Sequence, residues 1–299
     1  MKRLNNLYYS KRIKELLAEL QTAGTTLVVA PMGYGKTLAV QYFLQEVLRQ
    51  SIYGAGAEAF WQGVCHSWQN TELGAALLQQ SLPADANAKT LVLELFRQLL
   101  PQEPVYWFID DLHLLESSEA IDFLFALSKA GFADLHLLLV SRGQIFDGSR
   151  LLELGRKVFC LDKHDLALQR DELAEYSSRC GLQLTAQQLD ALHEACEGWF
   201  SVTYLNFLNY DRYQRFCLDT GSVYEMIANV LLRPLPSEQQ RLLLLMGQPE
   251  EFTPEQVAYA YGTSCRESVG RLLECNAFII RLANGRLRCH HMLKQATRH

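Results

Sequence analysis

The sequence contains the stretch Ala30-Pro31-Met32-Gly33-Tyr34-Gly35-Lys36-Thr37, preceded by the apolar, β-branched segment 25–29 and followed by the amphipathic segment 38–44. A glycine-rich loop between a buried parallel strand and a helix is the context in which such loops bind phosphate. Glycine lets backbone N–H groups turn toward phosphate oxygens, and the helix N-terminus adds the positive end of its dipole. The stretch therefore predicts a phosphate-binding loop, with Ala30 where the usual pattern begins with glycine.

The residues of this loop have distinct expected roles. We expect Lys36 to reach the β- and γ-phosphates and to assist catalysis, and we expect the Thr37 hydroxyl to ligate Mg²⁺. The remaining contacts with the nucleotide are expected from the neighbouring residues Gly33, Tyr34, Gly35 and Leu38.

Two adjacent acids provide the second signal. The segment 105–109 is rich in β-branched and aromatic residues and ends in Asp110-Asp111. Such a strand delivers carboxylates to the carboxyl edge of a parallel sheet, where open α/β sheets hold ligands. We expect Asp110 to bind Mg²⁺, largely through water, and Asp111 to polarise the attacking water in catalysis. Loop and acids together predict an α/β P-loop NTPase domain with a parallel sheet and ATP or ADP as its ligand.

A third apolar segment, 135–140, ends in Ser141-Arg142. A polar residue at the end of the strand beside the Mg²⁺-binding strand can sense the γ-phosphate. The guanidinium of Arg142 suits this role because its fork of donors matches phosphate oxygens. A plain surface arginine after a strand is the alternative interpretation.

Capping residues and apolar periodicity predict further elements around these strands. Ser10 is expected to cap a helix over 11–20, and the segment 57–61 is expected to form the second strand. Further helices are expected at 72–80, 88–100 and 117–127, and a last strand at 157–161.

Two groups of aromatic residues each have two interpretations. The group Leu7-Tyr8-Tyr9 either packs over an adenine ring or anchors the first helix to the core. The group Trp61, His66 and Trp68 forms either a binding site or part of the core, and core packing is favoured.

The composition is that of an ordinary soluble globular protein. With 299 residues and a mean hydropathy of −0.05, the chain is long enough for two or three domains. Its first residues lack the uninterrupted apolar run of a signal peptide, and no apolar run of about 18 residues occurs, so we expect a cytoplasmic protein without a membrane span. The net charge of −5 argues against a broad basic surface for nucleic acid. The eight cysteines lack C-x-x-C spacing and are expected to be reduced, mostly buried thiols.

After the last expected strand the pattern changes to consecutive helices. Near the end, Asn284-Gly285 lies between the short segments 277–281 and 286–291 and predicts a β-hairpin. Helices followed by a hairpin indicate a winged-helix module. The expected helices lie at 169–179, 185–196, 201–208, 223–232, 237–246, 254–261 and 265–275. We therefore expect a P-loop domain at 1–162, a small helical domain at 163–215 and a winged-helix domain at 216–299.

Five short motifs occur in a distinctive order along nearly the whole chain. They are Gly33-Tyr34-Gly35-Lys36-Thr37, Phe108-Ile109-Asp110-Asp111-Leu112-His113, Val140-Ser141-Arg142, Glu197-Gly198-Trp199 and His291. The first two are typical of P-loop ATPases generally. In combination, the motifs resemble those of the signal-transduction ATPases with numerous domains (STAND), and specifically the large ATP-dependent LuxR-type transcriptional activators.

This resemblance implies a molecular switch operated by ATP and ADP. His291 would contact the β-phosphate of ADP and hold a closed, monomeric resting form, and Gly198 would also contact the nucleotide. ATP together with an inducer would favour an open form that self-associates, and slow hydrolysis would reset it. Inducer and DNA would bind through a helical-repeat sensor and a helix-turn-helix outside these 299 residues, so the resemblance implies a piece of a longer regulator. Trp199 and Met292 stand where family members often have proline.

Several alternatives remain open. An exposed wing histidine is the main competing interpretation of His291, because a metal site formed with His290 conflicts with the opposite directions of adjacent side chains on a strand. A constitutively turning-over P-loop ATPase is the alternative function. A weaker one is DNA binding by the winged module itself through Arg281, Arg286 and Arg288.

Overall fold

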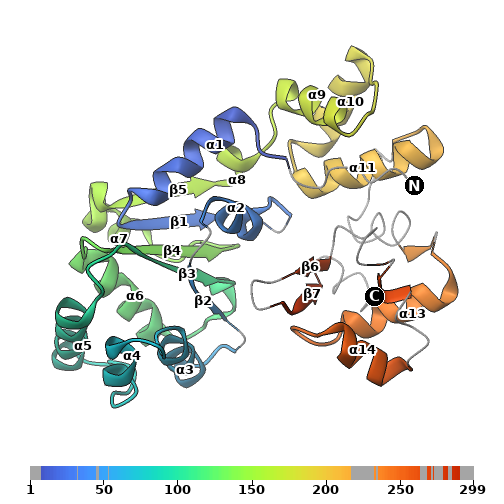
Figure 1. Ribbon diagram of the computed structural model, residues 1–299. Helices are drawn as coiled ribbons and strands as arrows, with labels where there is room; N and C mark the ends of the chain where they lie inside the picture. Colours follow the sequence, from blue (N-terminus) through green and yellow to red (C-terminus); the bar gives the residue numbers. More distant parts are fainter. Residues whose placement is uncertain are drawn as a thin grey trace. The chain divides into compact units, whose positions relative to one another are not determined.

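The chain folds into two compact units, shown in the computed structural model of Figure 1. One comprises Tyr9–Leu166, and the other comprises Ala167–His299 together with Met1–Tyr8. The structure describes residues 8–31, 33–44, 47–52, 54–216, 232–233, 235–262, 268–270, 272, 279–281 and 285–289.

The first unit is built on a five-stranded sheet whose neighbouring strands are all parallel, in the order β2-β3-β4-β1-β5 (Figure 1). Because β4 lies between β1 and β3, the glycine loop after β1 and the acidic pair after β3 open at the same edge of the sheet. The strands are β1 Thr25–Val29, β2 Leu48–Ser51, β3 Val105–Asp110, β4 Leu135–Ser141 and β5 Val158–Asp162. The strands expected at 25–29, 105–109, 135–140 and 157–161 are therefore confirmed.

Helices cover both faces of this sheet. In Figure 1, α1 and α2 lie on one side, and α3, α4, α5 and α6 lie on the other. The helices of the unit are α1 Lys11–Ala18, α2 Lys36–Phe43, α3 Ala57–Ser67, α4 Glu72–Leu77, α5 Ala86–Leu99, α6 Ser118–Ala130, α7 Gly148–Leu154 and α8 Lys163–Leu166, with short 3-10 turns η1 Glu19–Gln21, η2 Leu112–Leu114 and η3 Gly155–Lys157.

The second strand was predicted at the wrong place. Residues 57–61 begin the helix α3, and the second strand is β2 at Leu48–Ser51. In the helix, the buried side chains recur every three to four residues, which is a helical rather than a strand period: Phe60, Trp61, Val64, Cys65 and Trp68. The strand β2 escaped detection because its sequence, Leu-Arg-Gln-Ser, contains one apolar residue.

Aromatic side chains fill the core between the sheet and α3, α5 and α6. The ring of Trp68 lies edge-on to Trp107, with centroids 5.5 Å apart, and also edge-on to Phe96. Trp61 packs edge-on against Phe123. The prediction that both tryptophans belong to the core is confirmed, whereas His66 is exposed.

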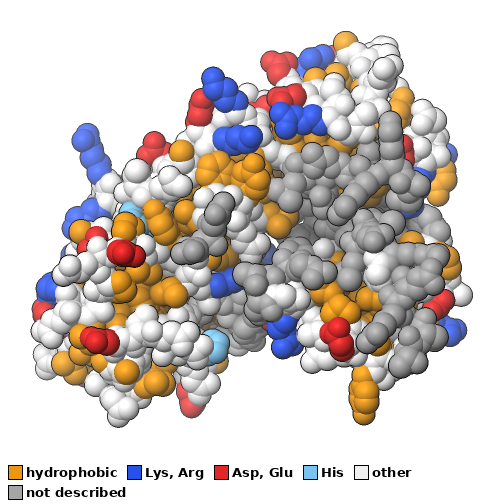
Figure 2. Space-filling view, viewed as in Figure 1, with side chains coloured by type: hydrophobic (Ala, Val, Ile, Leu, Met, Phe, Trp, Pro, Cys, Tyr) orange, Lys and Arg blue, Asp and Glu red, His pale blue; other side chains and the backbone are white. Residues whose placement is uncertain are grey.

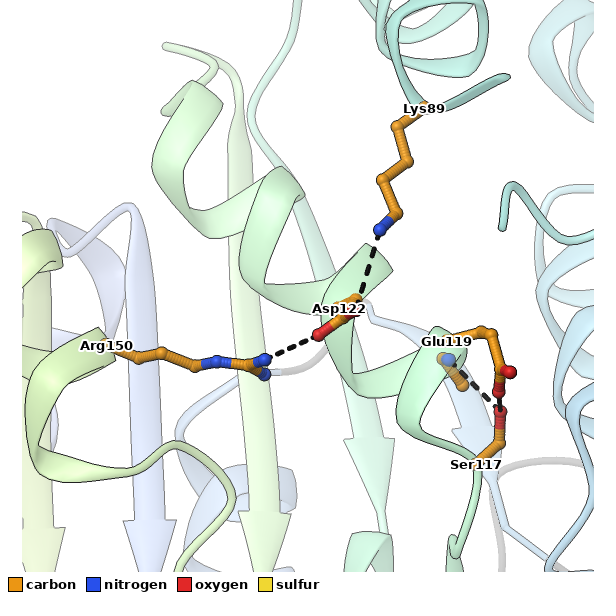
Figure 3. A network of polar contacts seen from close by, with 6 residues as sticks. Lys89, Ser117, Glu119, Asp122 and Arg150 are labelled. Carbon is orange, nitrogen blue, oxygen red and sulfur yellow. Dashed lines mark hydrogen bonds and ion pairs between the residues drawn. The ribbon is translucent and has the colours of Figure 1, made fainter. Parts of the chain in front are cut away.

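Caps and ion pairs fix the helices around this core. The Ser10 side chain accepts from the Ile13 N–H and caps α1 as predicted, although the α-helix ends at Ala18. On α6, the Asp122 carboxylate pairs with Arg150 of α7 at 2.6 Å and with Lys89 of α5 at 3.6 Å (Figure 3). This network links three helices on one side of the sheet.

The second unit is mainly helical. The predicted helices at 169–179, 185–196, 237–246 and 254–261 are confirmed to within a residue at either end, and the one predicted at 201–208 runs on to Tyr213. The expected helix at 223–232 lies almost wholly outside the described residues. Within the one expected at 265–275, residues 268–270 and 272 are helical and the rest lie outside the described residues. The helices are α9 Arg170–Arg179, α10 Ala186–Cys196, α11 Phe200–Tyr213, α13 Ser237–Met246 and α14 Pro254–Tyr261.

The predicted hairpin is present in the second unit. β6 Ile279–Arg281 pairs antiparallel with β7 Leu287–Cys289, and Gly285 has φ 79° in the connection between them. Positive φ values are the reason for glycine in such turns. Together with α13 and α14, this hairpin is a described part of the predicted winged-helix region.

Tyr8 anchors the start of the described chain to α9. Its ring stacks on Tyr176 with centroids 5.1 Å apart, its hydroxyl donates to Glu175 at 2.9 Å, and Arg179 lies over its face. Tyr8 therefore has an anchoring role, but it packs on α9 of the second unit and does not anchor the first helix to the core, as one interpretation predicted. Tyr9 instead packs against Tyr42 in the first unit.

Charged side chains of both signs are interspersed over the face of the molecule seen in Figure 2. Among the described cysteines, Cys65, Cys180, Cys196 and Cys289 are buried and Cys160 is exposed. Within the described part of the chain, no helix is both long and apolar enough to cross a membrane.

The turn at Gly198 brings two segments of the second unit into close contact. Gly198 has φ 72°, and its carbonyl accepts from the Leu168 N–H at 2.9 Å. A Cβ atom at this position would lie 2.5 Å from the Leu168 carbonyl oxygen. Both the backbone conformation and the close approach therefore require glycine here.

We predict that Gly198→Ala lowers the free energy of unfolding of the second unit by about 2–4 kcal/mol, because it adds a backbone clash to the cost of positive φ. Gly285→Ala is the matched control: Gly285 has φ 79°, but nothing lies within 4 Å of its Cβ position. This variant should cost only about 1 kcal/mol. Urea denaturation of both variants measures the difference, and equal costs would contradict the role of the close approach.

Candidate nucleotide-binding site

The predicted phosphate-binding loop joins the end of β1 to the start of α2. Gly33 has φ 85°, and Gly35, with φ 76°, is the N-cap residue of α2. No atom lies within 4 Å of a Cβ atom placed on Gly35, so the backbone conformation, not space, requires glycine there. Ala30 is buried and its N–H donates to the Ser141 carbonyl at 3.3 Å, which ties the loop to the end of β4.

Thr37 and Asp110 meet at the edge of the sheet. The Thr37 hydroxyl donates to Asp110 Oδ2 at 2.9 Å, and the Asp110 side chain is 3% exposed. Hydroxyl and carboxylate oxygens are the ligands that Mg²⁺ prefers. The two residues predicted to bind the metal therefore present oxygens that fit it.

Asp111 adopts an unusual backbone conformation directly after β3. Its φ of 59° and ψ of 31° lie in the left-handed region, and its N–H donates to Asp110 Oδ1 at 2.9 Å. For a residue other than glycine this conformation costs about 1–2 kcal/mol. Residues with such strained backbones cluster at functional sites. Here the left-handed conformation of Asp111 turns the chain directly after β3.

Lys36 is folded back over the loop. Its Nζ donates to the carbonyls of Ala30 at 2.6 Å and Pro31 at 2.9 Å. Burial lowers the pKa of the amine to about 8, with Arg142 adding to the effect and Asp110 and Asp111 opposing it. In this structure the amine donates to two neutral carbonyl groups, and a phosphate group at the loop would give it a negatively charged partner.

His113, on η2, was part of a quoted motif but was not among the predicted site residues. Burial, together with the positive charges of Arg142 and Lys36, lowers the pKa of His113 to about 4, and the negative charge of Asp111 opposes this shift. The buried Nδ1 atom has no hydrogen-bond partner among the described residues. The charges of Arg142 and Asp111 affect both Lys36 and His113, so these four side chains lie near one another at one corner of the sheet edge.

Arg49, on β2, is a site residue that sequence reasoning missed. Its guanidinium lies 3.7 Å from Asp110 Oδ2 and 5.5 Å from the centre of the Phe108 ring. No motif marks Arg49. Only the pairing of β2 with β3, in which Arg49 lies beside Phe108, brings it to Asp110.

Two predicted nucleotide contacts, Gly198 and His291, do not belong to the first unit. Gly198 belongs to the second unit, where the approach of Leu168 explains it. His291 and the neighbouring Met292 lie outside the described residues. Tyr34 and Leu38 are described and partly buried in and beside the loop.

Comparisons with known proteins bear on the fold. Residues 228–299 match the family model described as MalT winged helix domain. A search of curated proteins gives no match. The chain is similar to a solved structure of a STAND protein with a tetratricopeptide repeat sensor from Pyrococcus horikoshii, with a TM-score of 0.70 and 14% identity. A Walker-type ATPase of Pyrococcus abyssi is aligned over 100% of this chain and 98% of its own, with 13% identity and a TM-score of 0.47.

These findings establish the architecture. The fold is that of a P-loop NTPase with a winged-helix domain at its C-terminal end. The alignment with the Pyrococcus horikoshii protein covers 98% of this chain but only 42% of that chain, so this chain spans less than half of the length of that relative.

We predict that His113 stays uncharged in the folded protein down to about pH 4, so that its NMR titration midpoint lies well below the ordinary value of about 6.5. The unfolded chain takes up a proton at this histidine below about pH 6.5 and the folded chain does not, so folding stability falls as the pH is lowered toward 4. His113→Gln removes this contribution. Between pH 7 and pH 5, the free energy of unfolding should fall less in the His113→Gln variant than in the wild type. The difference should be at most about 2 kcal/mol. A titration midpoint between pH 6 and 7 would contradict the prediction.

Proposed function

We propose that this chain is the nucleotide-operated switch of a STAND-type transcriptional regulator of the LuxR class, which binds ATP and ADP with Mg²⁺ and hydrolyses ATP slowly. The observation that carries nucleotide binding is the contact between Thr37 and Asp110, at 2.9 Å, beneath a glycine loop that starts a helix. Two segments far apart in the sequence here supply the oxygen pair that a Mg²⁺–nucleotide complex needs.

Each residue of the corner has a role in this proposal. Backbone N–H groups at Gly33 and Gly35 and the Lys36 amine bind the phosphates, while Thr37 and Asp110 hold the metal ion. When bound, Mg²⁺ neutralises charge on the phosphate oxygens. Asp111 orients a water molecule and accepts its proton, and Arg142 stabilises charge on the γ-phosphate. Tyr34 and Leu38 complete the contacts around the loop.

The regulatory part of the proposal rests on the C-terminal region. The match of residues 228–299 to a MalT winged-helix domain favours a switch over a constitutively active ATPase. We propose the division 1–162, 163–215 and 216–299 into P-loop, small helical and winged-helix domains. His291 and Gly198 would contact ADP in a closed, monomeric, cytoplasmic resting form, and ATP with an inducer would favour self-association. Inducer and DNA would bind through domains of a longer protein.

We predict that the protein purified without added nucleotide carries ADP at nearly one molecule per chain. Denaturation followed by ion-exchange chromatography identifies the released nucleotide. Lys36→Ala should empty the site, because the phosphates lose their main cation. Lys129→Ala, which removes an exposed lysine on the surface of α6, is the matched control and should retain the nucleotide.

Two further variants separate the switch from its alternative. His291→Ala should lower the ADP occupancy, whereas Asp111→Asn should retain nucleotide and lower hydrolysis by about 100-fold. A wild-type protein that is empty when purified and hydrolyses added ATP rapidly would favour the constitutive ATPase.

We also predict that ADP affinity falls as the pH rises above about 8, the value to which burial lowers the Lys36 pKa. Phosphate binds the protonated amine, so binding above this pH requires proton uptake and weakens by about tenfold per pH unit. Calorimetry in buffers of different ionisation enthalpy measures the uptake. Lys36→Arg, whose guanidinium stays charged, should bind more weakly but without this pH dependence. A flat wild-type profile between pH 7 and 9.5 would contradict the prediction.

A further inference from the structure

Asp110 is a buried carboxylate whose charge is already compensated within the chain. Oδ1 accepts from the Asp111 N–H, and Oδ2 accepts from the Thr37 hydroxyl. Asp110 also forms an ion pair with Arg49, whose Nη2 lies 3.7 Å from the same Oδ2 atom. A carboxylate that is 3% exposed needs such a partner, because burial of an uncompensated charge is costly.

Arg49 is held in this position by two features. Its backbone is part of β2, paired in register with β3 so that Arg49 lies beside Phe108. Its guanidinium also lies 5.5 Å from the centre of the Phe108 ring, within the range of a cation–π contact. The side chain is 22% exposed, so it is partly shielded from water. Because arginine does not lose its proton in proteins, its charge is present at every accessible pH.

Asp110 Oδ2 therefore contacts both the permanently charged Arg49 and the hydroxyl of Thr37, the other predicted metal ligand. In the proposed function, which this inference presupposes, Thr37 and Asp110 hold Mg²⁺. A dication beside Oδ2 would lie close to the guanidinium, and like charges at short distance in a partly buried site repel each other strongly. Without the dication, the guanidinium supplies positive charge beside Oδ2, the same oxygen atom that the Thr37 hydroxyl of α2 contacts.

We propose that Arg49 is a built-in counter-ion of Asp110 that competes with Mg²⁺ and reduces the dependence of nucleotide binding on the metal. The chain then retains ADP when free Mg²⁺ is scarce and gains less affinity when Mg²⁺ is present. The relevant quantity is the ratio of the ADP dissociation constant in EDTA to that in saturating Mg²⁺. Arg49 keeps this ratio small.

A purely structural role for Arg49 gives a different expectation. If the guanidinium only packs on Phe108 and supports the sheet edge, its removal lowers the melting temperature without changing the ratio. The charge on Arg49 and its pairing with Asp110 are what the ratio reports.

The test measures binding of a fluorescent ADP analogue to the full chain in EDTA and in Mg²⁺. Arg49→Gln should weaken binding in EDTA and raise the ratio by roughly tenfold, since the site loses one positive charge. Arg49→Lys keeps the charge and should stay near the wild-type ratio. Arg150→Gln is the matched control: it removes an arginine of similar exposure that pairs with Asp122 on α6, and it should leave the ratio unchanged.

A double-mutant cycle isolates the contact with Asp110. In the Asp110→Asn background, Arg49→Gln should no longer raise the ratio, because the shared carboxylate is gone. An unchanged or lower ratio in Arg49→Gln, or an equal rise in the Asp110→Asn background, would overturn the role of Arg49. If Arg49→Gln fails to fold, a roughly tenfold rise in Arg49→Lys would likewise overturn it. Absence of saturable binding to the wild-type chain in both conditions would instead overturn the proposed nucleotide-binding function.

Discussion

The compensation of one buried carboxylate organises this structure. Asp110 lies at the end of β3, almost without access to solvent, and its two oxygens are met by a backbone N–H, a hydroxyl from α2 and a guanidinium from β2. Each partner comes from a different segment. These partners stabilise the buried carboxylate only while β2, β3 and α2 keep their relative positions, so the chemistry of the site depends on the register of the sheet.

The order of the strands explains how these segments come together. The loop after β1 and the acids at the end of β3 lie on opposite sides of β4, which ends at Ser141 and is followed by Arg142. The Ala30 N–H bonds to the Ser141 carbonyl and joins the loop to this central strand. The left-handed turn at Asp111 then places the second carboxylate near Lys36 and His113. Burial depresses the pKa values of both of these bases, and a phosphate group bound beside Lys36 would favour the protonated form of its amine.

The second unit follows a different structural logic. A short turn joins α10 to α11, and at Gly198 in this turn the backbone approaches Leu168 so closely that only glycine fits. Tyr8 fastens the N-terminal segment to α9 through stacking and a hydrogen bond to Glu175. The chain therefore passes between the two units twice, at Tyr8–Tyr9 and at Leu166–Ala167. The switch proposed above requires a second unit of this kind, connected to the P-loop domain.

The sequence by itself determined the phosphate-binding loop, the strand ending in Asp110 and Asp111, the strand before Arg142, and the succession of helices and a hairpin. These features are local: apolar runs, glycines with positive φ and acids at strand ends show in a few consecutive residues. The tertiary structure alone decided the place of β2 and the roles of Arg49 and His113. The strand β2 is a short edge strand with little apolar pattern, whereas the first residues of α3, 57–61, resemble a strand in a short window. Arg49 meets Asp110 only through the pairing of β2 with β3, and His113 loses its proton affinity only through burial beside Arg142 and Lys36. Such contacts join residues distant in the sequence, so no local pattern records them.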